Sequence, residues 1–187
     1  MKKSITDASP VKIINELKLD LACGQNKQEG YFGIDVSSDA KPDAVVDLTV
    51  FPWPIESNSA DDIVCSHYVE HTPDLMKFMN EVYRILKPGG KIKIIAPYYN
   101  SIRCWQDPTH LRAISEATFL YYNKQWRETN KLDHYPITCD YDYTYGYDMS
   151  VEWASRAEEA RNFAIKHYNN VINDIHVVLT ARPKSDK

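Results

Sequence analysis

The chain has 187 residues and a formal net charge of -4, from 22 Lys and Arg against 26 Asp and Glu. This length fits one domain with a sizeable core, and the slight acidic excess gives no general attraction for duplex nucleic acid. No apolar run approaches the roughly 18 residues of a membrane span, and the chain starts without an apolar signal segment, so we expect a cytoplasmic protein with no membrane partner.

Four short apolar runs in the first part of the chain predict buried β-strands. The first run alternates apolar residues and stops at small ones, as a strand entering a tight turn does. The second ends at Asp35, and the third ends at Asp47 and Leu48. Pro52 and Pro54 place a loop before the fourth run, because proline fits neither a helix interior nor a central strand. The predicted strands span residues 17–24, 30–37, 43–48 and 61–66.

Residues 71–90 predict a helix with both ends marked. Thr72 can cap its start and Pro73 suits its first turn, while the Pro-Gly-Gly sequence at 88–90 ends it. One face carries apolar residues at spacings of three and four, which would pack against a sheet. These residues are Leu75, Phe78, Met79, Val82 and Leu86. Residues 91–99 predict a fifth strand, and strands that alternate with a helix predict a parallel, doubly wound sheet.

The carboxy-terminal half has weaker patterns. It predicts two helices and two strands, at residues 115–128, 137–145, 150–168 and 174–183 in the order helix, strand, helix, strand. We expect one domain over residues 1–187, with residues 100–150 as an insertion on the substrate side.

The polar residues lie where the predicted strands end, which is where a doubly wound sheet binds its ligands. Small residues after the first strand let the backbone approach a ligand closely. Asp35 is placed to accept hydrogen bonds from both hydroxyls of a ribose, and Asp47 can hold an exocyclic amine. These positions predict a nucleoside-bearing ligand that lies across the strand ends.

The segments LDLACG, GIDVS, VVDLTVFPWPIESNSADDIVCSHYVEH and EVYRILKPGGKIKIIAPYY together resemble the class I S-adenosylmethionine-dependent methyltransferases, in particular the branch with a Glu-His pair after the fourth strand. The resemblance covers roughly residues 17–99. It implies a Rossmann-like α/β fold with a doubly wound, mostly parallel seven-stranded sheet whose last strand is antiparallel. It also implies S-adenosylmethionine as cofactor and S-adenosylhomocysteine as product.

The resemblance assigns roles to residues at the strand ends. Asp35 binds both ribose hydroxyls, Asp47 and Leu48 contact the adenine, and Ser66 and His67 lie beside the methionine part and the methyl group. His67 is thereby a catalytic candidate. The residues implied for the cofactor are Asp20, Ala22, Gly24, Asp35, Asp47, Leu48 and Ser66.

The sequence departs from the family pattern in the first turn. Ala22 and Asn26 replace the usual glycines and leave only Gly24. Ten residues separate Gly24 from Asp35, too few for the helix that normally links the first two strands. We therefore expect a short turn or a single helical turn there.

The sequence HYVEH, from His67 to His71, matches the inverted zincin pattern in which two histidines on one helix hold zinc and Glu70 acts as base. A strand that ends at Ser66 and the effect of Pro73 on its predecessor leave at most one helical turn for it. The four cysteines form no C-x-x-C pair, and no third ligand stands out by spacing. We therefore expect no metal, with Glu70 and His71 as hydrogen-bonded structural residues.

The region after the fifth strand is the predicted substrate side. His110 is a candidate general base, Arg112 can hold a carboxylate or phosphate, and Asp107 lies beside both. The alternative is that Asp107 only caps a turn and Arg112 pairs with an acidic neighbour. Tyr98 can line a substrate pocket, or belong to an edge strand with aromatic pairs.

These features predict an enzyme, a transferase that methylates oxygen or nitrogen on a small molecule such as a sugar, nucleotide or glycan precursor. A nucleic acid or protein acceptor is the weaker alternative. Two other classes stay open: a non-catalytic module that binds S-adenosylmethionine, and a zinc hydrolase that uses His67, Glu70 and His71. The sequence names neither the acceptor nor the oligomeric state.

Overall fold

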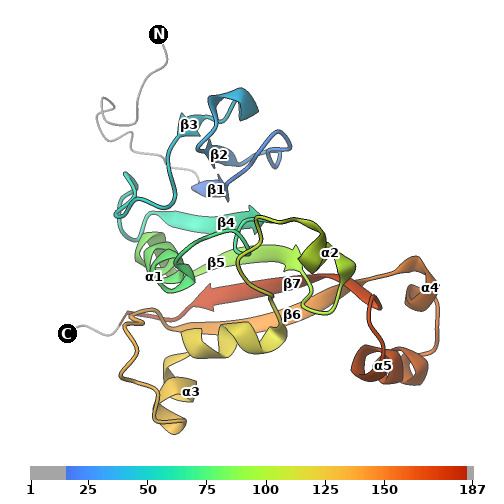
Figure 1. The fold of residues 1–187 in the computed structure, drawn as a ribbon. Coiled ribbons are helices and arrows are strands. Elements are labelled where there is room, and N and C mark those ends of the chain that lie inside the picture. The colour runs from blue at the N-terminus through green and yellow to red at the C-terminus, as the bar shows by residue number, and fades with distance from the viewer. Residues whose placement is uncertain (1–15, 185–187) are drawn as a thin grey trace.

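The computed structural model describes residues 16–184, whose strands form one mixed sheet (Figure 1). The sheet order is β3-β2-β1-β4-β5-β7-β6. All neighbouring pairs from β3 to β5 are parallel, and β7 runs antiparallel to both β5 and β6. This confirms the predicted mostly parallel, seven-stranded Rossmann-like sheet with an antiparallel last strand. The strands are β1 (Lys18–Leu21), β2 (Phe32–Asp35), β3 (Ala44–Val45), β4 (Ala60–Ser66), β5 (Leu86–Pro97), β6 (Tyr141–Met149) and β7 (Ile172–Ala181).

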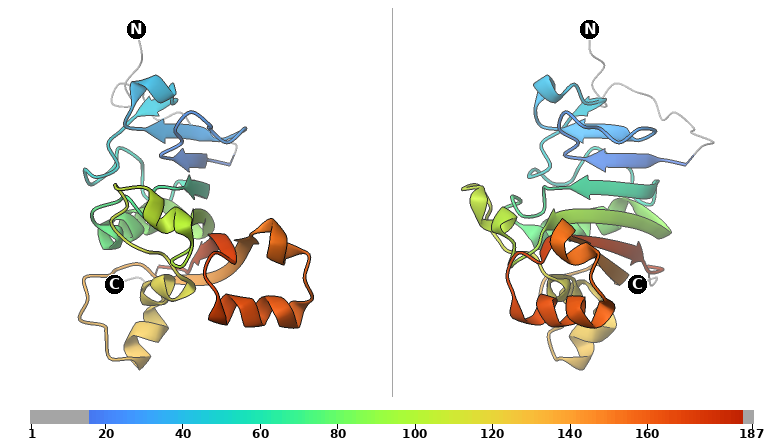
Figure 2. Two further views of the ribbon diagram at one scale, coloured as in Figure 1. Left: turned by 45° about the vertical axis from the view of Figure 1, so that its right-hand side comes forward. Right: turned by 90° about the vertical axis from the view of Figure 1, so that its right-hand side faces the viewer.

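The helices are short apart from two. They are η2 (Ser38–Ala40), α1 (Leu75–Ile85), α2 (Ile102–Gln106), η3 (Glu116–Tyr122), α3 (Lys124–Thr129), α4 (Val151–Ala154) and α5 (Glu158–His167). Figure 1 and Figure 2 show α4 and α5 together beyond the end of the sheet at which β4 and β5 finish. Within residues 16–184, no helix combines the length and apolar character that crossing a membrane requires.

The helix predicted at 115–128 is interrupted, and the one at 150–168 is split. Asn123 is extended, at φ -99° and ψ 119°, and its side chain accepts a hydrogen bond from the backbone N–H of Trp126. It therefore ends η3 and caps α3 at once, since Asn side chains compete with helical hydrogen bonding. Residues 155–157 separate α4 from α5. Helix α2 was not predicted from the sequence.

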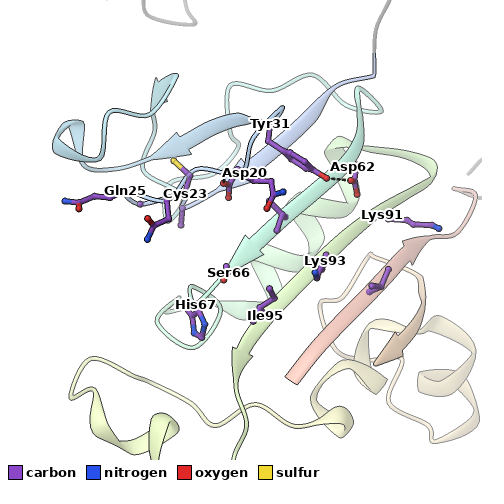
Figure 3. Close-up of a pocket in the computed structure, with 16 residues that line it drawn as sticks. Asp20, Cys23, Gln25, Tyr31, Asp62, Ser66, His67, Lys91, Lys93 and Ile95 are labelled. Atoms are coloured by element: carbon purple, nitrogen blue, oxygen red, sulfur yellow. Dashed lines mark hydrogen bonds between the residues drawn. The ribbon is translucent and has the colours of Figure 1, made fainter. Parts of the chain in front are cut away.

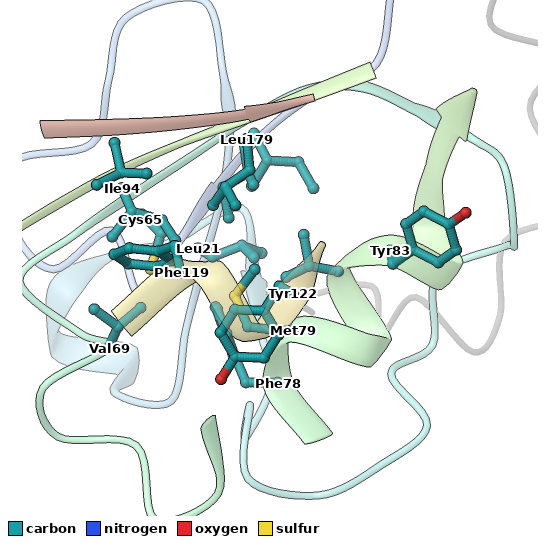
Figure 4. Packing of buried hydrophobic residues seen from close by; sticks show 14 of the residues in the cluster. Leu21, Cys65, Val69, Phe78, Met79, Tyr83, Ile94, Phe119, Tyr122 and Leu179 are labelled. Atoms are coloured by element: carbon teal, nitrogen blue, oxygen red, sulfur yellow. The ribbon is translucent and has the colours of Figure 1, made fainter. Parts of the chain in front are cut away.

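Helix α1 connects β4 to β5 and covers one face of the sheet (Figure 4). Its N-cap is Asp74, whose side chain accepts from the backbone N–H of Lys77 at 2.9 Å. The expectation that Thr72 caps this helix was wrong, because Thr72 is buried in the preceding turn. The helix also ends at Ile85, earlier than expected, and β5 already contains Pro88. The predicted apolar face is confirmed, since Leu75, Phe78, Met79 and Val82 are all buried.

Alternation along β4 and β5 separates the core from the opposite face of the sheet. Ile63 and Cys65 on β4, with Ile92 and Ile94 on β5, are buried on the α1 side. Their neighbours in sequence point the other way (Figure 3). These neighbours are Asp62, Val64 and Ser66 on β4 and Lys91, Lys93 and Ile95 on β5. All four cysteines are buried and unpaired, as reduced thiols would be.

The link between β1 and β2 consists of turns without a helix, as the spacing predicted. Ala22 has φ 55° and Gly24 has φ 51°, so both take the left-handed conformation. Ala22 carries a side chain in this conformation, which costs about 1 kcal/mol. The short link keeps the carboxyl ends of β1 and β2 close together.

Candidate active site

A cleft of about 680 Å³ starts at the carboxyl ends of β1 and β4 and continues over the face of the sheet opposite α1 (Figure 3). Five of the predicted site residues line it: Asp20, Ala22, Gly24, Ser66 and His67. The sequence analysis missed several other lining residues. Polar residues that alternate along two strands could have predicted part of this set. The missed lining residues include Tyr31, Asp62, Lys91 and Lys93.

Asp20 and the turn after β1 line the cleft where β1 ends. Asp20 is 4% exposed, and its Oδ2 accepts a hydrogen bond from the backbone N–H of Gln28 at 2.7 Å. Burial raises the pKa of Asp20. The carboxylate thus holds the loop that follows Gly24 against the strand end, where the backbone can approach a ligand.

Asp35 lies beside this turn, at the end of β2. Its Oδ2 accepts from the backbone N–H of Gly24 at 2.9 Å and its Oδ1 from that of Ser37 at 2.8 Å. Each carboxylate oxygen accepts a single hydrogen bond here and retains a free lone pair. The two oxygens are therefore oriented by the backbone and can still accept from a pair of hydroxyls.

Asp47 and Leu48 follow β3 and lie outside the residues that line the cleft. The Oδ1 atom of Asp47 accepts from the hydroxyl and the backbone N–H of Thr49, and these bonds lower the pKa of Asp47. The Leu48 side chain is buried in the core, and its carbonyl accepts from Nε1 of Trp53 at 3.2 Å. An adenine contact for this pair remains a prediction.

His67 lies directly after β4, with a left-handed backbone at φ 54°. Its N–H donates to the carbonyl of Ile95 at 2.8 Å, which fixes this conformation next to β5. Its side chain is 46% exposed, and Nδ1 lies 3.4 Å from Oε1 of Glu70. The polar contact with Glu70, and then its negative charge, raise the pKa of His67 against the opposing effect of burial.

Glu70 is 1% exposed, and neither carboxylate oxygen receives a hydrogen bond from any described residue. The distance to His67 is long for a hydrogen bond, so the two residues form a loose ionic contact. A buried carboxylate without donors is costly. The sequence analysis expected a hydrogen-bonded structural Glu70, and that expectation was wrong.

His110, the predicted general base, and the predicted substrate residues Asp107 and Arg112 come from one segment that lies against the loop that contains Glu70. The N–H of Leu111 donates to the carbonyl of Glu70 at 2.8 Å. Arg112 donates to the carbonyls of Val69, at 3.0 Å, Thr72 and Pro73. Its guanidinium thus braces the loop. Asp107 Oδ1 accepts from the N–H and hydroxyl of Thr109, so it also caps a turn.

Tyr98 is 2% exposed, and its hydroxyl donates to Oε2 of Glu116 at 3.0 Å. Its ring packs edge-on against Tyr147 of β6, with 5.3 Å between centroids. Burial raises its pKa. This side chain is therefore part of the core beneath the substrate side, and its predicted contact with substrate is not tested by this arrangement.

The turns from His67 to Asp74 have no continuous helix, because α1 begins only at Leu75. The two histidines of HYVEH are therefore not presented on one helical face, which the inverted zincin pattern requires. The structure instead brings His71 next to His110, with 4.6 Å between ring centroids.

Comparison with known proteins finds similarity to methyltransferases. A model of the methyltransferase domain matches residues 19–94. Demethylmenaquinone methyltransferase of Desulfitobacterium hafniense is 24% identical over 89% of this chain and 69% of its own length. The Listeria welshimeri protein of the same name is 27% identical over 42% of this chain, an alignment that spans only 34% of its own length.

A crystal structure of a methyltransferase from Archaeoglobus fulgidus that depends on S-adenosylmethionine shares the fold. Its TM-score is 0.64 at 18% identity, with 88% of this chain and 86% of that chain covered. The matched domain contains the strand ends that form the cleft, from Asp20 to His67. Residues 19–94 thus match a methyltransferase domain, and the chain shares its fold with a methyltransferase that depends on S-adenosylmethionine.

Proposed function

We propose that the enzyme transfers the methyl group of S-adenosylmethionine to an oxygen or nitrogen atom of a small molecule, with sugars, nucleotides and glycan precursors as the first acceptors to test. The observation that carries this proposal is the position of His67, which lies in the cleft with the buried carboxylate of Glu70 behind it.

Methyl transfer from a sulfonium is an in-line displacement, so the protein must align the acceptor atom with the methyl group. An acceptor O–H or N–H must also lose its proton, which calls for a base near the attacking atom. His67 meets both conditions, since it follows the strand end beside the cofactor cleft and its ring is partly exposed. The carbon–sulfur bond breaks as the new bond to oxygen or nitrogen forms, and the proton passes to the imidazole. Glu70 then stabilises the imidazolium.

The cofactor would lie across the strand ends. Asp35 would accept from the ribose hydroxyls through the lone pairs that its backbone donors leave free. The turn from Ala22 to Gly24 would face the methionine part, and Asp47 with Leu48 would lie near the adenine. S-adenosylhomocysteine would leave by the same opening after transfer.

A small acceptor is supported by the net charge of the chain and by the size of the cleft. The net charge of -4 gives no attraction for a polyanion. The cleft volume of about 680 Å³ lies within the usual range of small-molecule sites. Residues 100–150, which include α2, η3 and α3, would supply the acceptor side.

A quinol acceptor is the second candidate. It is favoured by the relative named demethylmenaquinone methyltransferase, whose alignment covers 89% of this chain. Such a reaction would place the methyl group on a ring carbon, and His67 would then remove a ring or hydroxyl proton. The two candidates differ in the atom that is methylated.

The test begins with calorimetric titration of S-adenosylmethionine and S-adenosylhomocysteine into the purified protein, where we expect micromolar dissociation constants. Acceptors are then screened with methyl-labelled cofactor, using nucleotide sugars, nucleosides and a short-chain demethylmenaquinol, and products are identified by mass spectrometry. Labelled O- or N-methyl product would support the proposal. Cofactor binding with transfer only to the quinol carbon would replace it by the second candidate, and no binding would overturn both.

A further inference from the structure

Glu70, His71 and His110 form a compact cluster of possible metal-binding side chains. One potential metal-donor atom from each residue lies within 4.8 Å of the others. His110 comes from a segment that lies 39 residues after His71, so the cluster does not exist in the local sequence. It differs from the H-x-x-E-H set, because His67 is replaced by His110.

The buried carboxylate of Glu70 is the first sign that a cation belongs here. Neither of its oxygens accepts a hydrogen bond from residues 16–184, and the residue is 1% exposed. The nearby guanidinium of Arg112 donates to backbone carbonyls and makes no hydrogen bond with Glu70. His67 approaches Oε1 only to 3.4 Å. His67 approaches only Oε1, so Oε2 has no partner among the described residues, and a cation bound there would compensate the buried charge.

The ring of His71 is oriented so that one nitrogen is left with a lone pair. Its Nδ1 lies 3.0 Å from the hydroxyl of Thr109. That hydroxyl donates its hydrogen to Oδ1 of Asp107 at 2.7 Å, so it accepts from His71. Nδ1 therefore carries the hydrogen, and Nε2 is the free donor atom.

His110 is held in the same way. Its Nδ1 lies 2.8 Å from the carbonyl oxygen of Cys104, which can only accept. The hydrogen must be on Nδ1, and Nε2 again keeps its lone pair. Metal-binding histidines in proteins usually donate their second N–H to a carbonyl or carboxylate-linked group, as both rings do here.

We propose that Glu70, His71 and His110 bind one divalent transition-metal ion, through one carboxylate oxygen and two imidazole nitrogens. Two nitrogen donors favour Zn²⁺ and its first-row neighbours over Mg²⁺ or Ca²⁺, which prefer oxygen. Three protein ligands leave at least one coordination position of the metal ion for water or another oxygen ligand. The site adjoins the cleft, because Glu70 also contacts His67.

Binding requires a modest contraction of the cluster. Donors bound at about 2.1 Å in a tetrahedral arrangement lie roughly 3.4 Å apart, whereas one candidate atom from each residue, with either ring nitrogen of a histidine counted, now lies within 4.8 Å of the others. Both histidines lie in loops and are only partly buried, so their rings can move inward. Glu70 is fixed by Leu111 and by the Arg112 brace, so it would serve as the anchor.

The test is titration of chelator-treated full-length protein with Zn²⁺, Co²⁺ and Mg²⁺ by calorimetry, with the absorption spectrum recorded for Co²⁺. We expect one equivalent of Zn²⁺ and the visible bands of Co²⁺ bound by nitrogen and oxygen, with Mg²⁺ at least 100-fold weaker. His71→Ala and His110→Ala should each weaken Zn²⁺ binding at least tenfold. His134→Ala, which removes an exposed histidine outside the cluster, should bind as the parent does.

Folding of each variant is checked by thermal melting. A folded His110→Ala variant with parental Zn²⁺ affinity would overturn the proposal, as would an equal loss in His134→Ala. Glu70→Gln gives a further comparison, since it should weaken Zn²⁺ binding while removing the unpaired charge from the metal-free protein. The titration contains no methyl donor or acceptor, so its result is independent of the proposed reaction.

Discussion

His67 and Glu70 stand three residues apart after β4, with Nδ1 of the histidine 3.4 Å from the buried carboxylate. The left-handed backbone of His67, at φ 54°, turns the chain so that its ring lies in the cleft while Glu70 is buried. A strained backbone at this point costs stability, and such strain is concentrated at functional sites.

Replacing His67 by Asn removes the imidazole and keeps the left-handed backbone conformation. Asn tolerates the left-handed region better than most residues, so the fold should be kept. Loss of the base should lower kcat about 100-fold with an acceptor found in the screen. The Kd of S-adenosylhomocysteine should stay within about threefold of the parent value, since the change spares the ribose site. A parental kcat in a folded His67→Asn variant would remove His67 from the mechanism.

Asp35→Ala should weaken the binding of S-adenosylmethionine about 100-fold. The change removes both ribose acceptors and the anchor for the N–H of Gly24, and lost charge-assisted hydrogen bonds of this kind amount to about 3 kcal/mol, roughly a 100-fold loss in affinity. Calorimetry gives the measurement. Asp39→Ala is the matched control, because this exposed carboxylate in η2 lies outside the cleft. Near-parental affinity in Asp35→Ala would contradict the assignment.

Gly24→Ala should lower the free energy of unfolding by about 1 kcal/mol, because a side chain is strained at φ 51°. An added Cβ meets no atom within 4 Å, so backbone conformation is the only expected cost. Gly146→Ala in β6 is the control, since it also has open space but no positive φ. Urea denaturation compares the two variants. Equal effects would show that the left-handed turn is not maintained in solution.

Asp74→Ala should destabilise the protein by about 1 kcal/mol at pH 7, because it removes the N-cap of α1. The hydrogen bond from the N–H of Lys77 lowers the pKa of Asp74 below its usual 3.8. A lowered folded pKa means that this stabilisation is complete above the unfolded pKa, about 3.9, and is lost as the pH falls through the folded value.

The control for this cap is Asp74→Ser, which keeps an acceptor that does not titrate. Denaturation curves at pH 7 and near pH 3 should show the difference between parent and Asp74→Ala shrinking on acidification. Asp74→Ser should remain more stable than Asp74→Ala at both pH values. A difference between parent and Ala that does not change with pH would contradict the cap assignment.

The sequence by itself determined how the strands follow one another along the chain and which residues end them, because apolar runs and turn residues are local signals. It also predicted the short link after Gly24, since ten residues cannot contain the usual helix. It misassigned the cap of α1 to Thr72. Local preference favours Thr and Asp alike, and the burial of Thr72 in the preceding turn decided between them.

Only the tertiary structure decided which polar residues meet after β4. Pairing of β4 with β5 and the brace from Arg112 to the loop carbonyls bring the 107–112 segment against Glu70. That packing places His71 beside His110 and leaves the Glu70 carboxylate without a hydrogen-bond donor among the described residues. No periodic pattern in the sequence indicates either feature. The physical reason is that strand patterns depend on neighbours along the chain, whereas a site of this kind depends on loops that the sheet places side by side.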